Sequence, residues 1–208
     1  MNAGVLNQSM SYTILGSARS PFVRINRIFM MHNSIPFEFK LLNFLDDPKH
    51  AAELAKESPI NRVPILLVDG EKIFDSRVIT NYLIKKHNLK PLSIDDENRV
   101  SVVYSCLDTA LTLFQMKKDG YDINQPGFFI SRHRERIPQN LKYLDSWIKE
   151  LSPSKKEDWN YASIALYSFL FWAHAREIFD VHSYPTAQKF IERFANCTGV
   201  QETTFSYK

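Results

Sequence analysis

The sequence predicts two domains: an α/β domain with the element order βαβαββα, followed by an all-helical domain. Short apolar runs of strand length alternate with helical patterns before Asn88, and only helical periodicity follows it. The length of 208 residues suits two compact units, because domains most often contain roughly 100–150 residues. The expected bounds are residues 11–87 for the α/β domain, 88–95 for a linker and 96–208 for the helical domain.

The α/β domain is expected to begin with a short strand at residues 11–17. A helix signal follows at once, because Ser20 is of a type preferred at the N-cap and Pro21 suits the first helical position. An extended run at residues 37–42 predicts a second strand, and residues 49–57 predict a thin, polar second helix. This half of the domain therefore has the order β-α-β-α.

A hairpin and a third helix complete the domain. Residues 65–68 and 71–74 have strand character, and the Asp69-Gly70 pair between them is typical of a tight type I′ turn. Such a turn joins antiparallel strands. A third helix is expected to begin at Asp75-Ser76 and to end near Lys86, because apolar residues recur there at helical spacing.

The second domain is predicted to contain helices alone. Asn160 is expected to cap the third of them, with Ser163 three residues later reciprocating weakly. The four helices are expected over residues 97–117, 128–151, 160–179 and 185–196.

Composition excludes several classes of protein. Apolar residues make up 44% and charged residues 24%, as in ordinary globular proteins, which argues against a disordered or fibrous chain. The net charge of +3 is too small for a nucleic-acid-binding surface. The excess lies in the first part, where 11 Lys and Arg face 8 Asp and Glu up to His87, and it could favour a small anionic ligand.

No membrane, metal or disulfide signal is found. The longest apolar stretch, residues 164–175, is shorter than the roughly 20 residues of a membrane span. The first ten residues lack the features of a secretory signal, so a cytoplasmic location is expected, and Met10 could be the natural start. The six histidines show no usual metal spacing, and Cys106 and Cys197 are expected to be reduced.

Four local motifs, in this order along the chain, resemble those of the cytosolic glutathione S-transferases. They lie at residues 20–24, 61–66, 75–77 and 162–166. The resemblance is to the serine-type transferases of bacteria and plants. It implies a thioredoxin-like glutathione-binding domain, an all-helical second domain and a homodimer with Arg77 near its interface.

Ser20 is the catalytic residue that this resemblance implies. A thiol must ionise before it attacks an electrophile, and the positive end of a helix dipole lowers a thiol pKa. The Ser20 hydroxyl at such an end could donate a hydrogen bond to the sulfur of glutathione and stabilise the thiolate. The alternatives are that Ser20 is only an N-cap, or that Ser17 supplies the donor.

The second motif is expected to supply backbone hydrogen-bonding groups and a positive charge for glutathione. The resemblance implies a cis bond between Val63 and Pro64, which would turn the Val63 backbone outward to pair with glutathione as an added strand. A trans, strand-initiating Pro64 is the alternative. Arg62 either meets a carboxylate of glutathione or is an exposed loop residue.

The third motif is assigned to the γ-glutamyl end of glutathione. The resemblance implies that Ser76 and its helix N-terminus receive the carboxylate and that Asp75 receives the ammonium group. Many family members have Glu where this chain has Asp75. A plain Asp-Ser N-cap pair is the alternative. Lys40, Lys49 and His50 could face the glycyl carboxylate, and the spacing does not choose among them.

The expected function is therefore conjugation of the glutathione thiolate to a hydrophobic electrophile, as in detoxification, without a metal or other cofactor. A non-catalytic binding or regulatory protein of the same fold is one alternative. A glutathione-dependent thiol oxidoreductase or peroxidase is another, although neither cysteine lies at the first motif. Aromatic residues that could wall the electrophile pocket, or only fill the core, are Tyr104, Phe114, Trp172, Phe205 and Tyr207.

Overall fold

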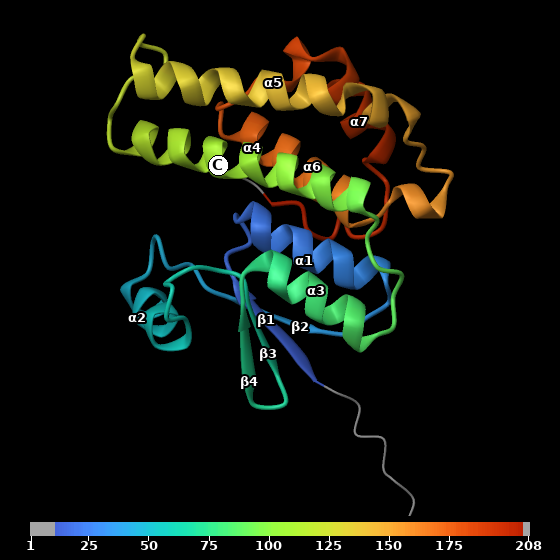
Figure 1. Cartoon of the computed structure of the whole chain (residues 1–208). Helices are drawn as coiled ribbons and strands as arrows, with labels where there is room; N and C mark the ends of the chain where they lie inside the picture. The colour runs from blue at the N-terminus through green and yellow to red at the C-terminus, as the bar shows by residue number, and fades with distance from the viewer. Residues whose placement is uncertain (1–10, 206–208) are drawn as a thin grey trace, which may run out of the picture. The chain divides into compact units, whose positions relative to one another are not determined.

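The computed structural model describes residues 11–205 (Figure 1). The expectations about the first ten residues, including the start at Met10, and about Tyr207 lie outside the described residues. The chain divides into two compact units between His87 and Asn88, and each is described by itself.

The first unit has the order βαβαββα of a thioredoxin-like domain, which confirms the predicted fold class. Its four strands form one mixed sheet in the spatial order β2-β1-β3-β4. β1 pairs with β2 in parallel, and the other two pairs are antiparallel. The elements are β1 (Tyr12–Gly16), α1 (Pro21–His32), β2 (Glu38–Leu41), α2 (Pro48–Glu57), β3 (Ile65–Val68), β4 (Glu71–Phe74) and α3 (Ser76–Lys86).

Helices cover both faces of this sheet. Leu54 of α2 is buried against Leu15 of β1 and Ile65 of β3. Alternate strand residues point to the opposite face, where α1 and α3 lie side by side (Figure 1). The expected type I′ turn joins β3 to β4, since Asp69 and Gly70 have positive φ angles of 48° and 84°.

Within residues 88–205, every regular element of the second unit is a helix, as predicted. Two of its helix bounds differ from the prediction by three residues or more. α4 begins at Ile94 instead of residue 97, because the Ser93 side chain caps it by accepting from the Asp96 N–H. α6 ends at Ala175 instead of residue 179, because Glu177 takes a positive φ of 56°. The helices are α4 (Ile94–Lys118), α5 (Phe128–Glu150), α6 (Tyr161–Ala175) and α7 (Pro185–Phe194), with the short 3-10 turns η1 (Lys156–Asp158) and η2 (Val181–Ser183).

α6 is the core of the second unit. It packs against α4 and α7, and its buried residues extend around its circumference. Its N-cap is stronger than predicted: Asn160 Oδ1 accepts from the Ala162 N–H at 2.9 Å, and the Asn160 N–H donates to Ser163 Oγ at 2.9 Å. Both halves of a capping box are therefore present. No helix within residues 11–205 is long and apolar enough to cross a bilayer.

Candidate functional site

The register of the sheet brings the three predicted motifs of the first unit to the same end of the strands, which we call the sheet edge. Leu15, one residue before the end of β1, pairs with Ile65 at the start of β3, and Ile65 pairs with Phe74 at the end of β4. The chain therefore leaves β1, enters β3 and leaves β4 at the same end of the sheet. The segments beyond these points hold Ser20, the Val63-Pro64 pair and the Asp75-Ser76 pair.

Ser20 is the N-cap of α1, as the sequence predicts. Its Oγ accepts a hydrogen bond from the Val23 N–H at 3.4 Å, near the upper limit for such a bond. The side chain is half-buried at the positive end of a 12-residue helix. Because a serine hydroxyl both donates and accepts, the long cap bond leaves its proton for another acceptor.

The loop before Ser20 is held by its own bonds. Ser17 is 5% exposed, and its Oγ accepts from the Arg19 N–H at 3.2 Å. Its carbonyl accepts from the Ser20 N–H at 3.1 Å. The Arg19 guanidinium forms an ion pair with Asp46, which lies after β2. These contacts favour Ser20 over Ser17 as the hydroxyl that faces a ligand.

Close packing also fixes the path from β1 into α1. A Cβ on Gly16 would lie 2.5 Å from the Val23 Cγ2 atom, and Val23 is fully buried. Only glycine therefore lets the strand end approach the first turn of the helix this closely. Sequence reasoning missed this contact, whose only signal is a glycine at the end of a strand.

The peptide bond between Val63 and Pro64 is cis. Pro64 is buried and Val63 is half-buried. Within the described residues, the Val63 backbone has no hydrogen-bond partner. Arg62 is exposed, and its backbone N–H donates to the Ser58 Oγ at 3.3 Å.

Asp75 and Ser76 open α3, and they differ sharply in burial. The exposed Asp75 carboxylate caps the helix by accepting from the Arg77 N–H at 2.8 Å. Its backbone has a φ of 71°, which is uncommon and costly for a residue with a side chain. Ser76 is only 2% exposed. The sequence does not reveal this strained backbone, because the presence of Asp does not by itself indicate a positive φ.

A buried polar link holds the start of α3 against α1. Asn26 Nδ2 donates to the Ser76 carbonyl and to Thr80 Oγ1, both at 2.9 Å. Thr80 Oγ1 in turn donates to the Ser76 carbonyl at 3.0 Å. Asn26 and Thr80 are fully buried, so these bonds form in a low-dielectric interior. The two helix N-termini at the site edge are thereby positioned relative to each other.

Two of the three candidates for the glycyl carboxylate, Lys40 and His50, have partners for their side chains within the first unit. Lys40 pairs with Glu53 at 2.6 Å, and the hydrogen bond that it donates to the Glu53 carboxylate raises the pKa of Lys40. The His50 Nδ1 accepts from the Asn43 N–H at 3.1 Å. The backbone N–H of Lys49 donates to the Asp47 carboxylate that caps α2, at 2.8 Å. These contacts do not select any of the three for a ligand.

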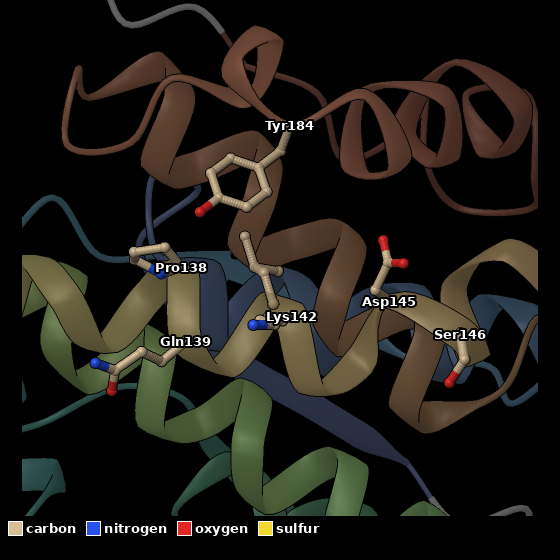
Figure 2. A pocket seen from close by; sticks show the side chains of 7 residues that line it. Pro138, Gln139, Lys142, Asp145, Ser146 and Tyr184 are labelled. Atoms are coloured by element: carbon tan, nitrogen blue, oxygen red, sulfur yellow. The ribbon is translucent and has the colours of Figure 1, made fainter.

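The aromatic residues predicted to wall a pocket in the second unit have core contacts. The Tyr104 and Tyr161 hydroxyls are 2.6 Å apart, the Phe114 and Trp172 rings meet at 5.4 Å, and the Phe205 ring lies 6.5 Å from that of Phe171. A pocket of about 600 Å³ lies beside α5 (Figure 2). Its lining residues are Pro138, Gln139, Leu141, Lys142, Asp145, Ser146 and Tyr184.

Comparisons with known proteins agree with this arrangement. Residues 10–85 match the family model described as glutathione S-transferase, N-terminal domain. The uncharacterized GST-like protein YibF of Escherichia coli K12 is 29% identical over 162 residues, covering 74% of this chain and 77% of that protein. Hematopoietic prostaglandin D synthase of Rattus norvegicus is 24% identical over 148 residues, covering 71% and 69% respectively.

A solved structure shares the fold along nearly the whole chain. The glutathione S-transferase of Methylobacillus flagellatus KT, crystallised with glutathione bound, matches with a TM-score of 0.78 and 21% identity. The match covers 94% of this chain and 100% of that one. The family match over residues 10–85 agrees with the α/β fold of the first unit and with its cis bond between Val63 and Pro64. Residues 10–85 of this chain are therefore assigned to the N-terminal domain of the glutathione S-transferase family.

Proposed function

We propose that this protein binds glutathione at the sheet edge of its first unit and transfers the thiolate to a hydrophobic electrophile. The observation that carries the proposal is the common position of Ser20, Val63 and Asp75, which the strand register places at one end of the sheet. A donor hydroxyl, a backbone amide and carbonyl without a partner in the described chain, and a carboxylate match the polar groups of a tripeptide thiol.

Each group has a definite role in this proposal. The Val63 N–H and C=O pair with the backbone of the cysteinyl residue as an added strand would. Asp75 receives the γ-glutamyl ammonium group, and the α3 N-terminus at Ser76 receives the adjacent carboxylate. The exposed Arg62 guanidinium supplies a positive charge for a carboxylate of the peptide.

The chemical step needs little beyond an ionised sulfur. The Ser20 hydroxyl donates a hydrogen bond to the thiolate, and the α1 dipole stabilises the same negative charge. The thiol proton passes to solvent, and the sulfur lone pair forms a bond to the electrophilic carbon. In a substitution, the leaving group departs with the electron pair of its broken bond; in an addition, the carbanion formed takes a proton from water.

The thiol oxidoreductase alternative has no suitable nucleophile among the cysteines. Cys106 is buried in α4, and burial raises the pKa of its thiol to about 12, so almost none is ionised at neutral pH. Burial also raises the pKa of Cys197. Ser20 occupies the helix N-terminus where an exchange reaction would need a sulfur.

Calorimetry with glutathione, followed by rate measurements on aryl halides, enals and peroxides, tests the proposal. We expect one binding site in the first unit and conjugation of at least one electrophile. S-methylglutathione should bind at the same site and give no product, because its sulfur cannot ionise. Binding without turnover on any substrate would support the non-catalytic alternative, and absence of binding would overturn the proposal.

We also propose the binding partners and the location of the enzyme. Its partners are glutathione, a small hydrophobic electrophile and a second copy of the chain, in a cytoplasmic location. The homodimer follows from the family resemblance, and sedimentation of the purified protein measures it directly.

A further inference from the structure

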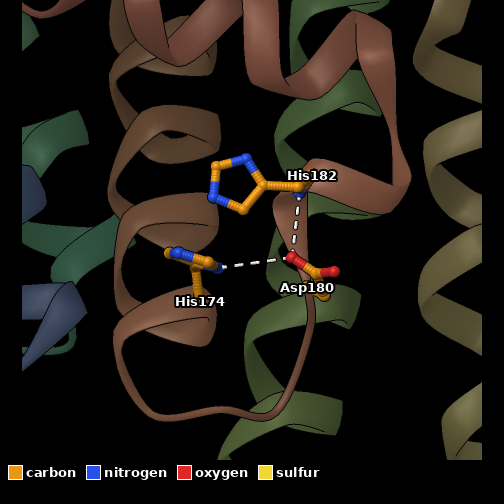
Figure 3. Close-up of side chains that lie close together, drawn as sticks. All are labelled: His174, Asp180 and His182. Atoms are coloured by element: carbon orange, nitrogen blue, oxygen red, sulfur yellow. Dashed lines mark hydrogen bonds and ion pairs between the residues drawn. The ribbon is translucent and has the colours of Figure 1, made fainter.

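Two histidines and an aspartate of the second unit lie close together at and after the C-terminal end of α6. His174 lies in the last turn of α6, Asp180 follows that helix, and His182 lies in η2 (Figure 3). One ligand atom from each lies within 4.8 Å of the other two. The His174 Nδ1 is 3.8 Å from the Asp180 Oδ1, and the two imidazole centroids are 4.9 Å apart.

The chain around the cluster is anchored in the core. Phe179 stacks on Phe169 with a centroid distance of 6.4 Å and contacts Tyr184 at 5.2 Å. Val181, between Asp180 and His182, is 4% exposed. The stacking of Phe179 on the buried Phe169 and the burial of Val181 fix the backbone of the segment, and the polar side chains between and after them are left at the surface.

The Asp180 carboxylate is oriented by its neighbours. Its Oδ1 accepts from the His182 N–H and its Oδ2 from the Ser183 Oγ, both at 3.0 Å. These bonds hold the pKa of Asp180 below its usual value, with the backbone bond as the main cause. Hydrogen bonds to a ligating carboxylate are the kind of support that metal sites use to orient their ligands.

From this geometry we propose that His174, Asp180 and His182 bind a divalent transition-metal ion of the zinc class. Two imidazole nitrogens and one carboxylate oxygen are a ligand set that suits Zn²⁺, with a fourth position left for water. The present separations are longer than the roughly 3–3.5 Å between ligands of a bound zinc, as Zn–N and Zn–O bonds of about 2.0–2.2 Å require. Rotation of the side chains closes this gap, since His174 and Asp180 are 42% and 60% exposed.

The ion would also lie at a favourable electrostatic position. The C-terminal end of α6 carries the negative end of the helix dipole, and His174 belongs to its last turn. The spacing of these three residues resembles no usual metal motif, which is why the sequence predicts no metal here. The turn after α6 brings the three residues together. A bound ion would link the end of that helix to η2.

A zinc titration of the full chain, prepared without a histidine tag, tests this proposal. Competition with a chromophoric chelator should give one Zn²⁺ per chain. His174→Ala and His182→Ala should each weaken binding about tenfold or more, since even supporting residues of metal sites carry effects of this size. His133→Ala is the matched control, because His133 is a half-buried histidine on α5, outside the cluster, whose Nδ1 lies 2.9 Å from the Phe129 carbonyl.

A second readout separates a built site from general surface binding. Hydrogen exchange should slow on addition of Zn²⁺ in residues 175–183, and it should not change in the His174→Ala variant. Equal affinity in the wild type and the two alanine variants, or an equal loss in the His133→Ala control, would overturn the proposal. Circular dichroism of each metal-free variant checks that it is folded, and the exposed His182 offers a second test if His174→Ala is unstable.

Discussion

The N-termini of α1 and α6 are both capped by a side chain, but the α6 cap makes more hydrogen bonds. At α6, Asn160 and Ser163 bond each other's backbone in both directions, and Ser163 is fully buried. At α1, the half-buried Ser20 makes one cap bond, and that bond is 3.4 Å long. The α6 cap provides acceptors for the backbone N–H groups of Asn160, Ala162 and Ser163, whereas the α1 cap leaves a hydroxyl proton at the positive end of a helix.

This difference separates a structural cap from a candidate catalytic one. The α6 helix lies in the core of the second unit, so its cap stabilises the fold. The α1 cap lies at the sheet edge where two other motifs converge, and its incomplete engagement suits a group that must also bind a ligand. We therefore expect substitutions at the two caps to have opposite signatures in activity and stability.

The largest effect is expected for Ser20→Ala on conjugation. A hydrogen bond to a charged group is worth about 1.5–3 kcal/mol, so kcat/KM should fall roughly 10-fold to 100-fold. Thermal unfolding should change little, because the cap bond that is lost is long. Ser17→Ala is the control and should keep most of the rate; the opposite ranking of these two variants would assign the donor to Ser17.

Asn160→Ala should give the reverse signature. Loss of an N-cap costs about 0.5–2 kcal/mol, and this variant loses both bonds of the Asn160 carboxamide oxygen. The free energy of unfolding in urea should fall by about this amount, while glutathione affinity stays unchanged. A drop in affinity at temperatures where the variant is fully folded would contradict the division between the two caps.

The smallest effect is expected for Asp75→Asn. Asn caps helices as well as Asp and tolerates positive φ, so the start of α3 should persist. Because Asp75 is exposed, the ion pair with the ammonium group of glutathione is worth about 0.2–1 kcal/mol. Glutathione affinity should therefore fall roughly 1.5-fold to 5-fold by calorimetry. Unchanged affinity would remove Asp75 from the binding site.

Local signals in the sequence predicted most of the first unit. Ser20 and Pro21 mark the start of α1, and Asp69-Gly70 marks the hairpin, because caps and tight turns depend on residues a few positions apart. The motif order also led to the thioredoxin-like fold. The prediction was less accurate where a helix end depends on backbone conformation, as at Glu177 after α6.

Contacts between distant segments could not be predicted in this way. The link from Asn26 to Ser76 and Thr80 joins residues about 50 positions apart, and the approach of Gly16 to Val23 depends on how a helix packs on a strand. The cluster of His174, Asp180 and His182 likewise exists only because a turn brings two imidazoles together. Such contacts follow from tertiary packing, which short-range patterns do not encode.

The pKa of the glutathione thiol bound to the protein tests the central claim most directly. Ultraviolet absorbance of the thiolate, measured against pH for the wild type and for Ser20→Ala at saturating glutathione, gives this pKa in both. The wild-type value should lie below the roughly 8.5 of a free cysteine thiol, and it should be about 1–2 pH units higher in Ser20→Ala. Equal pKa values in the two proteins would show that Ser20 is only a helix cap.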